Sequence, residues 1–269
     1  MVSFYGYDAG SLPSRPGWSE RLHRLFLESS LILAEGPAMA DRIRSLGCPP
    51  ERLRIVSLGI DLAEWPEPSR SPRRTADQPA RLLVVASLRP KKGVDDAIRA
   101  FAFARSRLPP GSQLSIVGDG PERERLLLLA RDLGIEGAIT WLGYRPQAHL
   151  RSLLLEADLL IQPSVVAPDG DTEGGAPVVL LQAAAAGLPV VATRHADIPF
   201  IVPDGQTGHL VGEHDPEAIA AAIVRSLDAP EWGRLSENAR QRALDQFSAE
   251  RTRAGLAQLY RSLLEERRP

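Results

Sequence analysis

The feature of this chain that most constrains its fold is a repeated alternation of short apolar runs with amphipathic segments. Residues 81–88 read RLLVVASL, an unbroken run typical of a strand buried on both faces of a parallel sheet. Residues 94–108 follow with apolar side chains at helical spacing. This alternation predicts an α/β fold with a doubly wound parallel sheet of Rossmann-like type. Further strands are expected at residues 113–118, 138–143, 158–164 and 189–193, and further helices at residues 122–134, 149–157, 177–187 and 215–227.

The chain divides into two α/β parts of unequal length. Residues 67–79 are crowded with Pro, Ser and Arg, which predicts a linker. Residues 1–66 repeat the strand and helix alternation on a smaller scale, but they are too few for a full domain of this type, so we expect a partial N-terminal α/β domain. Residues 80–246 are expected to form a complete C-terminal domain. Residues 247–269 are expected to be helical and to pack back on the N-terminal part.

Composition excludes several classes of protein. The 32 basic and 34 acidic residues give a net charge of −2 without a long block of one sign, which disfavours a general nucleic-acid binder. The single cysteine, Cys48, cannot form an internal disulfide, and no Cys/His spacing resembles a metal site. Neither a membrane-spanning run nor a signal peptide is visible. We therefore expect a cytoplasmic protein without a bound metal or other cofactor.

The first candidate site is the loop that follows the strand at residues 81–88. In parallel sheets, ligands bind beyond the carboxyl ends of the strands. This loop holds Ser87, Arg89, Lys91 and Lys92, and the two lysines are the only ones in the chain. They precede a helix whose free N–H groups and dipole favour an anion, so a phosphate site is the hypothesis and a solvated basic loop the alternative. Lys92 stands next to the helix start, whereas Lys91 is expected to point to water.

The second loop has two glycines, Gly118 and Gly120, which allow a backbone to approach a ligand closely. The dinucleotide fingerprint fails because Arg123 stands where a third glycine is required. Taken alone, the spacing is that of a tight turn.

The third loop, residues 167–177, is acidic and rich in glycine. Its start resembles a calcium loop, but the twelfth position is Leu180 in place of the required acid, so calcium binding is rejected. What is left is a loop at a helix start that is bracketed by Glu173 and Gln182. His195, after the next expected strand, is either a surface residue or a group that approaches the same ligand.

Five segments occur in a fixed order, at residues 87–102, 116–121, 141–164, 173–193 and 204–211. In that order and spacing the chain resembles the retaining glycosyltransferases of family 4, also called glycosyl transferases group 1, which have the two-domain GT-B architecture. The resemblance runs from about Glu35 to the C-terminus. The opening FYGYD is similar to a family segment that usually reads HGYD. The resemblance therefore implies that the first part of the N-terminal domain is absent from this chain.

The resemblance also implies roles for particular residues. Lys92 would bind the donor diphosphate, Glu173 would contact the sugar hydroxyls, and both would be catalytic. Tyr5 and Asp8 would lie on the acceptor side. The remaining donor-binding residues would be Ser87, Arg89, Gly118, Gly120, Gly174, Gly175, Ala176, Pro177 and Gln182.

This sequence departs from the family pattern at three of these positions. Gln182 stands where the family has the acid that holds the ribose, and its spacing from Glu173 is one residue longer than usual. Ser87 replaces an arginine, and Tyr5 replaces a histidine near the acceptor. A glutamine still hydrogen-bonds a ribose, but without the strength of a charged partner.

The resemblance implies transfer of a hexose from a nucleoside diphosphate sugar with retention, in polysaccharide or glycolipid synthesis, and the residue types suit that reaction. Fixed cations and N–H groups stabilise the departing diphosphate, and the anomeric carbon becomes oxocarbenium-like. The acceptor would be a carbohydrate or a lipid-linked glycan, which leaves open a peripheral contact with the inner membrane face. The alternatives are a non-catalytic nucleotide-sugar-binding subunit, completed by another chain that supplies the N-terminal half, and an epimerase of the same fold.

Overall fold

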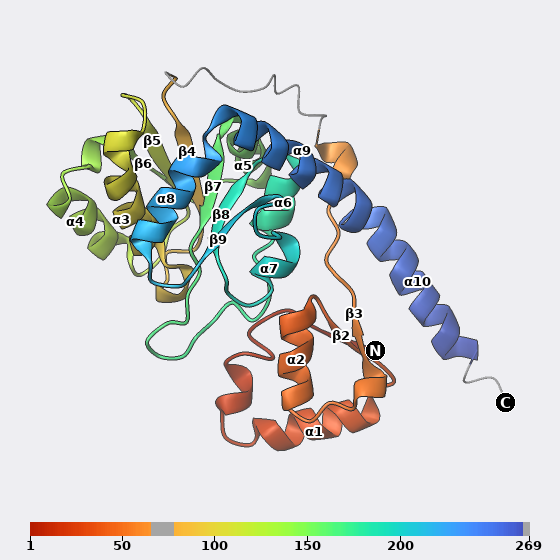
Figure 1. Ribbon diagram of the computed structural model, residues 1–269. Helices are drawn as coiled ribbons and strands as arrows, with labels where there is room; N and C mark the ends of the chain where they lie inside the picture. The colour runs from red at the N-terminus through yellow and green to blue at the C-terminus, as the bar shows by residue number, and fades with distance from the viewer. Residues whose placement is uncertain (66–77, 266–269) are drawn as a thin grey trace.

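The computed structural model describes residues 1–65 and 78–265, and it contains two parallel sheets (Figure 1). The smaller sheet has the order β1-β2-β3, and the larger has the order β6-β5-β4-β7-β8-β9. Every paired strand runs parallel to its neighbour, so the predicted α/β class is confirmed. The strands are β1 (Val2–Phe4), β2 (Ile32–Ala34), β3 (Leu53–Ile55), β4 (Arg81–Val85), β5 (Gln113–Val117), β6 (Ile139–Gly143), β7 (Leu159–Gln162), β8 (Val190–Thr193) and β9 (Gly208–Val211).

Two helices complete the smaller part of the chain. These are α1 (Trp18–Glu28) and α2 (Pro37–Ser45), and their buried side chains Phe26, Met39 and Ile43 form one cluster with β2. Sequence periodicity indicated α2 but neither α1 nor β1. Helix α1 buries only Leu22 and Phe26, and β1 has three residues, so neither leaves a strong apolar pattern.

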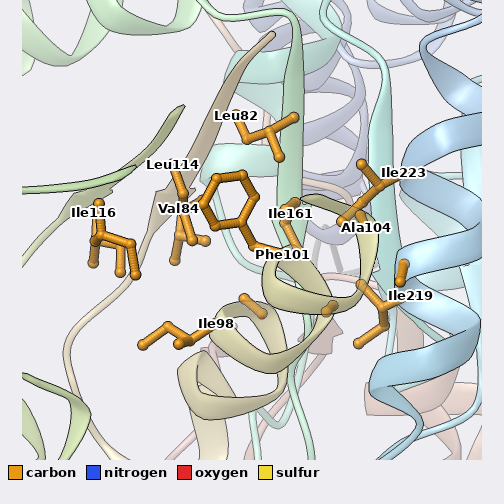
Figure 2. Close-up of a cluster of buried hydrophobic side chains, with 14 of the residues drawn as sticks. Leu82, Val84, Ile98, Phe101, Ala104, Leu114, Ile116, Ile161, Ile219 and Ile223 are labelled. Carbon is orange, nitrogen blue, oxygen red and sulfur yellow. The ribbon is translucent and has the colours of Figure 1, made fainter. Parts of the chain in front are cut away.

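The larger sheet carries helices on both faces, as expected of a doubly wound fold. Adjacent residues of β4 point to opposite faces, so that Leu82 and Leu83 lie in different apolar clusters. Figure 2 shows the first cluster, in which Phe101 packs among side chains of β4, β5 and β7. One face carries α3 (Val94–Ala104), α4 (Arg123–Asp132) and α8 (Pro216–Ser226), and the other carries α5 (Gln147–Glu156), α6 (Val179–Ala185), α7 (Ile198–Ile201) and α9 (Ala229–Gln246).

Strand β9 was not among the expected strands. A Cβ atom at Gly208 would overlap the carbonyl oxygen of Val190, so this strand requires a glycine that weakens its β pattern. Of the predicted linker, residues 67–77 lie outside the described residues.

The last helix, α10 (Ala249–Glu265), returns toward the smaller sheet and extends beyond it (Figure 1). Phe247 O accepts the N–H of Ile60 at 2.8 Å, and the N–H of Ala249 donates to Ile60 O at 2.9 Å. The Thr252 hydroxyl donates to Ser57 O at 3.1 Å. These bonds join the end of the chain to the segment after β3. Among the described helices, none is both long and apolar enough to cross a membrane.

Candidate functional site

The loops after β4 and β5 meet at the carboxyl edge of the larger sheet. A Cβ atom at Gly118 would overlap the carbonyl oxygen of Ala86, and one at Gly120 would lie 2.5 Å from Leu88 O. The two glycines are therefore required by the approach of one loop to the other. Ser87 and Arg89 are exposed on the same rim.

Lys92 and Glu173 form an ion pair on this edge. Lys92 Nζ lies 2.7 Å from both carboxylate oxygens of Glu173, and the two side chains are 16% and 7% exposed. Lys92 ends a short 3₁₀ turn, and Gly93 follows with a φ of +57°. A Cβ at Gly93 would overlap Pro163 O, so only glycine allows the lysine to approach the loop after β7. The fold thus brings together two residues that are far apart in the sequence.

Two polar residues at the end of β7 support the Glu173 carboxylate. The Ser164 hydroxyl donates to Glu173 Oε1 at 2.7 Å, and Gln162 Nε2 donates to Ser164 Oγ at 2.9 Å. Both residues are buried. The sequence predicts both residues at the end of a strand and assigns no role to either. The available signal was the segment QPS, residues 162–164, which ends an apolar strand with polar side chains.

Lys91 does not point to water, and that expectation was wrong. Its Nζ lies 3.1 Å from Asp171 Oδ2 and donates to Thr172 O at 3.0 Å. Asp171 Oδ1 also accepts the Ser11 hydroxyl at 3.1 Å, which links the loop to the smaller part of the chain. The course of the loop after β7 brings the Thr172 carbonyl and the Asp171 carboxylate within reach of Lys91.

His195 lies beneath the turn that carries Glu173, so its interpretation as a surface residue was wrong. The side chain is 3% exposed. Its Nδ1 lies 2.7 Å from Glu213 Oε1, and its Nε2 lies 2.8 Å from Thr172 Oγ1 and 3.3 Å from the Glu173 backbone nitrogen. Burial raises the pKa of the Glu213 carboxyl, but the hydrogen bonds from His195 and the Val166 N–H outweigh it and hold this pKa below its usual range.

The turn after β1 packs on the same loop. The Asp8 carboxylate accepts the backbone N–H groups of Tyr5, Gly6 and Ala9 at 2.9 to 3.1 Å. A Cβ at Gly174 would lie 2.6 Å from Gly6 Cα, so the two turns touch through glycines. The structure therefore places Asp8 beside the Glu173 turn as an organiser of backbone, while the ring of Tyr5 is 59% exposed.

Two acidic residues that sequence reasoning missed lie between the two parts of the chain. Glu35 follows β2, and a Cβ at Gly175 would overlap its carboxylate. Burial, and then the charges of Asp197, Asp8 and Glu173, raise the pKa of Glu35 to about 7. Nothing in the sequence separated Glu35 from the other acidic residues of the chain.

Asp197 belongs to the larger part but caps a helix of the smaller part. Its carboxylate accepts the N–H of Ala38 at 2.7 Å and that of Met39 at 3.0 Å, at the start of α2. A Cβ at Gly36 would overlap this carboxylate. Burial raises the pKa of Asp197, although the two N–H groups oppose the shift.

Gln182 is buried in the first turns of α6, and Ala176 and Pro177 are half-buried just before that helix. A cavity of about 460 Å³ separates the loop after β7 from α2. The residues that line this cavity include Gly10, Ala38, Arg42, Thr172, Gly174, His195 and Glu213.

Within residues 1–65 and 78–265, no group of His, Cys, Asp or Glu side chains is placed to hold a metal ion.

Comparison with known proteins finds relatives that are named as glycosyltransferases. The sequence model of the family Glycosyl transferases group 1 matches residues 67–243. A protein of Escherichia coli with the provisional name colanic acid biosynthesis glycosyltransferase WcaL is 31% identical over 263 residues, which cover 97% of this chain and 63% of the relative. The amylovoran biosynthesis glycosyltransferase AmsK of Erwinia amylovora is 35% identical over 205 residues, or 75% of this chain and 48% of AmsK. The chain thus spans under two thirds of the length of these relatives.

A solved structure shows the same fold. The crystal structure of Anabaena HepE in complex with UDP and glucose superposes with a TM-score of 0.81 at 21% identity, covering 97% of this chain and 71% of HepE. The GT-B architecture that the sequence predicted is confirmed by such neighbours.

Proposed function

Because the chain belongs to the glycosyl transferases group 1, we propose that it binds a nucleoside diphosphate sugar and transfers the hexose to a glycan acceptor with retention of configuration. The acceptor is proposed to be a carbohydrate or lipid-linked glycan in polysaccharide synthesis. The observation that carries the proposal is the pair formed by Lys92 and Glu173 at the carboxyl edge of the sheet. Proteins named for glycan synthesis among the relatives support it.

The ion pair gives each partner a place in the reaction. Without a ligand, Glu173 neutralises Lys92 at 2.7 Å. The donor diphosphate carries more negative charge than one carboxylate, so it takes the ammonium of Lys92 and releases the Glu173 carboxylate to the sugar hydroxyls. The N–H groups at the start of α3 contribute to the same anion site.

The bond that breaks in the proposed reaction is the one whose cleavage places negative charge on the diphosphate. The bond from the anomeric carbon to the diphosphate oxygen breaks, and Lys92 stabilises the charge that develops on the leaving group. The acceptor oxygen bonds to the oxocarbenium-like carbon from the same face, and its proton passes to the departing diphosphate. No step in this scheme requires a divalent metal.

Calorimetry with nucleotide probes tests the proposal. UDP-glucose is the first donor to titrate, since HepE has been crystallised with UDP and glucose. Glu173→Ala is expected to lower the affinity for UDP-glucose relative to UDP about ten- to a hundredfold, because only the sugar uses the carboxylate. UDP itself should bind at least as tightly as before, since Glu173 no longer competes with it for Lys92. Lys92→Ala is expected to weaken the binding of both ligands, and Arg107→Ala, in the 3₁₀ turn that follows α3, serves as the control.

The outcomes separate the candidate functions. Tight binding of UDP, GDP or ADP sugars without release of the free sugar or its transfer would favour the non-catalytic binding subunit. Binding that EDTA abolishes and magnesium restores would contradict the metal-free scheme. Equal loss of UDP and UDP-glucose on Glu173→Ala would show that the loop does not contact the sugar.

A further inference from the structure

Backbone strain is concentrated beside one hydrogen-bonded pair near the site. Among the residues that the structure describes, Ala196 and His214 are the ones other than glycine with positive φ, at 46° and 56°. Each directly follows a member of the pair His195–Glu213. Such conformations are unfavourable for side chains with a Cβ and persist where the surroundings fix them, often at functional sites. The pair is therefore held in place at a conformational cost on both sides.

The neighbours of His195 determine which of its nitrogens carries the proton. The Glu173 backbone N–H can only donate, so Nε2 at 3.3 Å must accept. The proton then lies on Nδ1 and is donated to Glu213 Oε1 at 2.7 Å. The Thr172 hydroxyl, 2.8 Å from Nε2, faces the same lone pair. His195 thus acts as a neutral acceptor beneath two consecutive residues of the loop.

Several contacts hold the turn that carries Glu173, and Lys91 donates to Thr172 O among them. Lys92 and Ser164 bind the carboxylate, and His195 binds the backbone. In the proposed reaction, the diphosphate takes Lys92 away from Glu173. The contact with His195 does not involve the carboxylate, so it persists after that exchange.

We propose that His195, oriented by Glu213, is a positioning residue that holds the Thr172 hydroxyl and the Glu173 backbone so that the released carboxylate meets the donor sugar. This inference rests on the proposed function. It assigns no contact between the imidazole and the sugar, and it predicts a loss that concerns the sugar and spares the diphosphate.

The chain offers a matched control for the loss of a buried imidazole. His209, in β9, is 4% exposed, and its Nε2 lies 3.0 Å from Glu231 Oε1. This second buried histidine also pairs with a glutamate, but its contacts with Glu231 and Arg225 lie away from the Glu173 loop. His209→Phe therefore measures the effect of removing such a pair by itself.

The test compares His195→Phe, His195→Gln and His209→Phe by titration with UDP and with UDP-glucose. His195→Phe is expected to keep the affinity for UDP within about twofold and to lose about tenfold in affinity for UDP-glucose. Cleavage of UDP-glucose is expected to fall ten- to a hundredfold, because a small displacement of a reacting group is costly. His195→Gln should recover part of both, since its amide oxygen can accept the Glu173 N–H. In the unmodified chain, long-range ¹H–¹⁵N spectra should show the His195 proton on Nδ1.

Each outcome bears on a definite claim. Failure of the unmodified chain to bind UDP-, GDP- or ADP-glucose would refute the proposed function, and the comparison is made with whichever of these donors binds. If the unmodified chain discriminates and folded His195→Phe discriminates equally well, the positioning role is overturned. An equal loss in His209→Phe would overturn it too. If His195→Phe does not fold, Glu213→Gln keeps the ring but removes its carboxylate, and unchanged discrimination in that variant would refute the inference.

Discussion

The helix cap that Asp197 supplies across the two parts of the chain gives the sharpest stability prediction. Its carboxylate is 2% exposed and accepts two N–H groups at the start of α2, at 2.7 and 3.0 Å. In Asp197→Asn one oxygen still accepts, but the amide NH₂ faces the other N–H. Loss of a cap and of a charge-assisted bond costs about 2 kcal/mol, and relief of a buried charge offsets part of it. A net loss of about 1–2 kcal/mol lowers Tm by roughly 2–8 °C.

Thermal unfolding and amide hydrogen exchange measure the effect, with Asp215→Asn as the control. Asp215 caps α8 through Ala218 within the larger part, where it is exposed and water can replace it. We expect a smaller decrease in Tm for Asp215→Asn and faster exchange of Ala38 and Met39 only for Asp197→Asn. An unchanged Tm together with unchanged exchange at Ala38 and Met39 would refute the idea that this cap joins the two parts.

Three further predictions follow from single residues. Burial and neighbouring acids raise the folded-state pKa of Glu35 to about 7, so its stabilising contribution is present below the unfolded pKa near 4.5 and is lost as the pH rises toward 7. Glu35→Gln should remove this pH dependence and gain about 1 kcal/mol at pH 8 in urea unfolding, since solvent screens a half-buried carboxyl; parallel pH profiles for both proteins would contradict this. Gly93→Ala should lower Tm and weaken UDP binding, because residue 93 has a φ of +57° and an added Cβ would overlap Pro163 O. Unchanged Tm and unchanged UDP affinity in this variant would contradict the prediction. Phe101→Ala should cost about 3–5 kcal/mol in urea unfolding, because the ring fills the core shown in Figure 2, and a loss below about 1 kcal/mol would contradict that packing.

Much of the fold was predictable from local patterns. Strand β4 is buried on both faces of the sheet and α3 packs one face on it, so the first leaves an unbroken apolar run and the second a helical period. Helix α1 and strands β1 and β9 are short or only partly buried, and their sequences carry no comparable pattern. Secondary structure can be predicted from the sequence where burial requires a regular pattern of apolar side chains over many consecutive residues.

The sequence also singled out Lys92 and Glu173, because rare lysines and an acidic glycine-rich loop both follow predicted strands. It had no means of showing that they lie 2.7 Å apart, since the parallel sheet alone aligns their loops. Glu35 and Asp197 acquire their surroundings from segments more than a hundred residues distant, and His195 acquires its own from loops about twenty residues away on either side, through contacts that leave no local period. Burial, charge and hydrogen-bond partners of such side chains are decided by tertiary packing, whereas the elements that carry them are decided by the chain nearby.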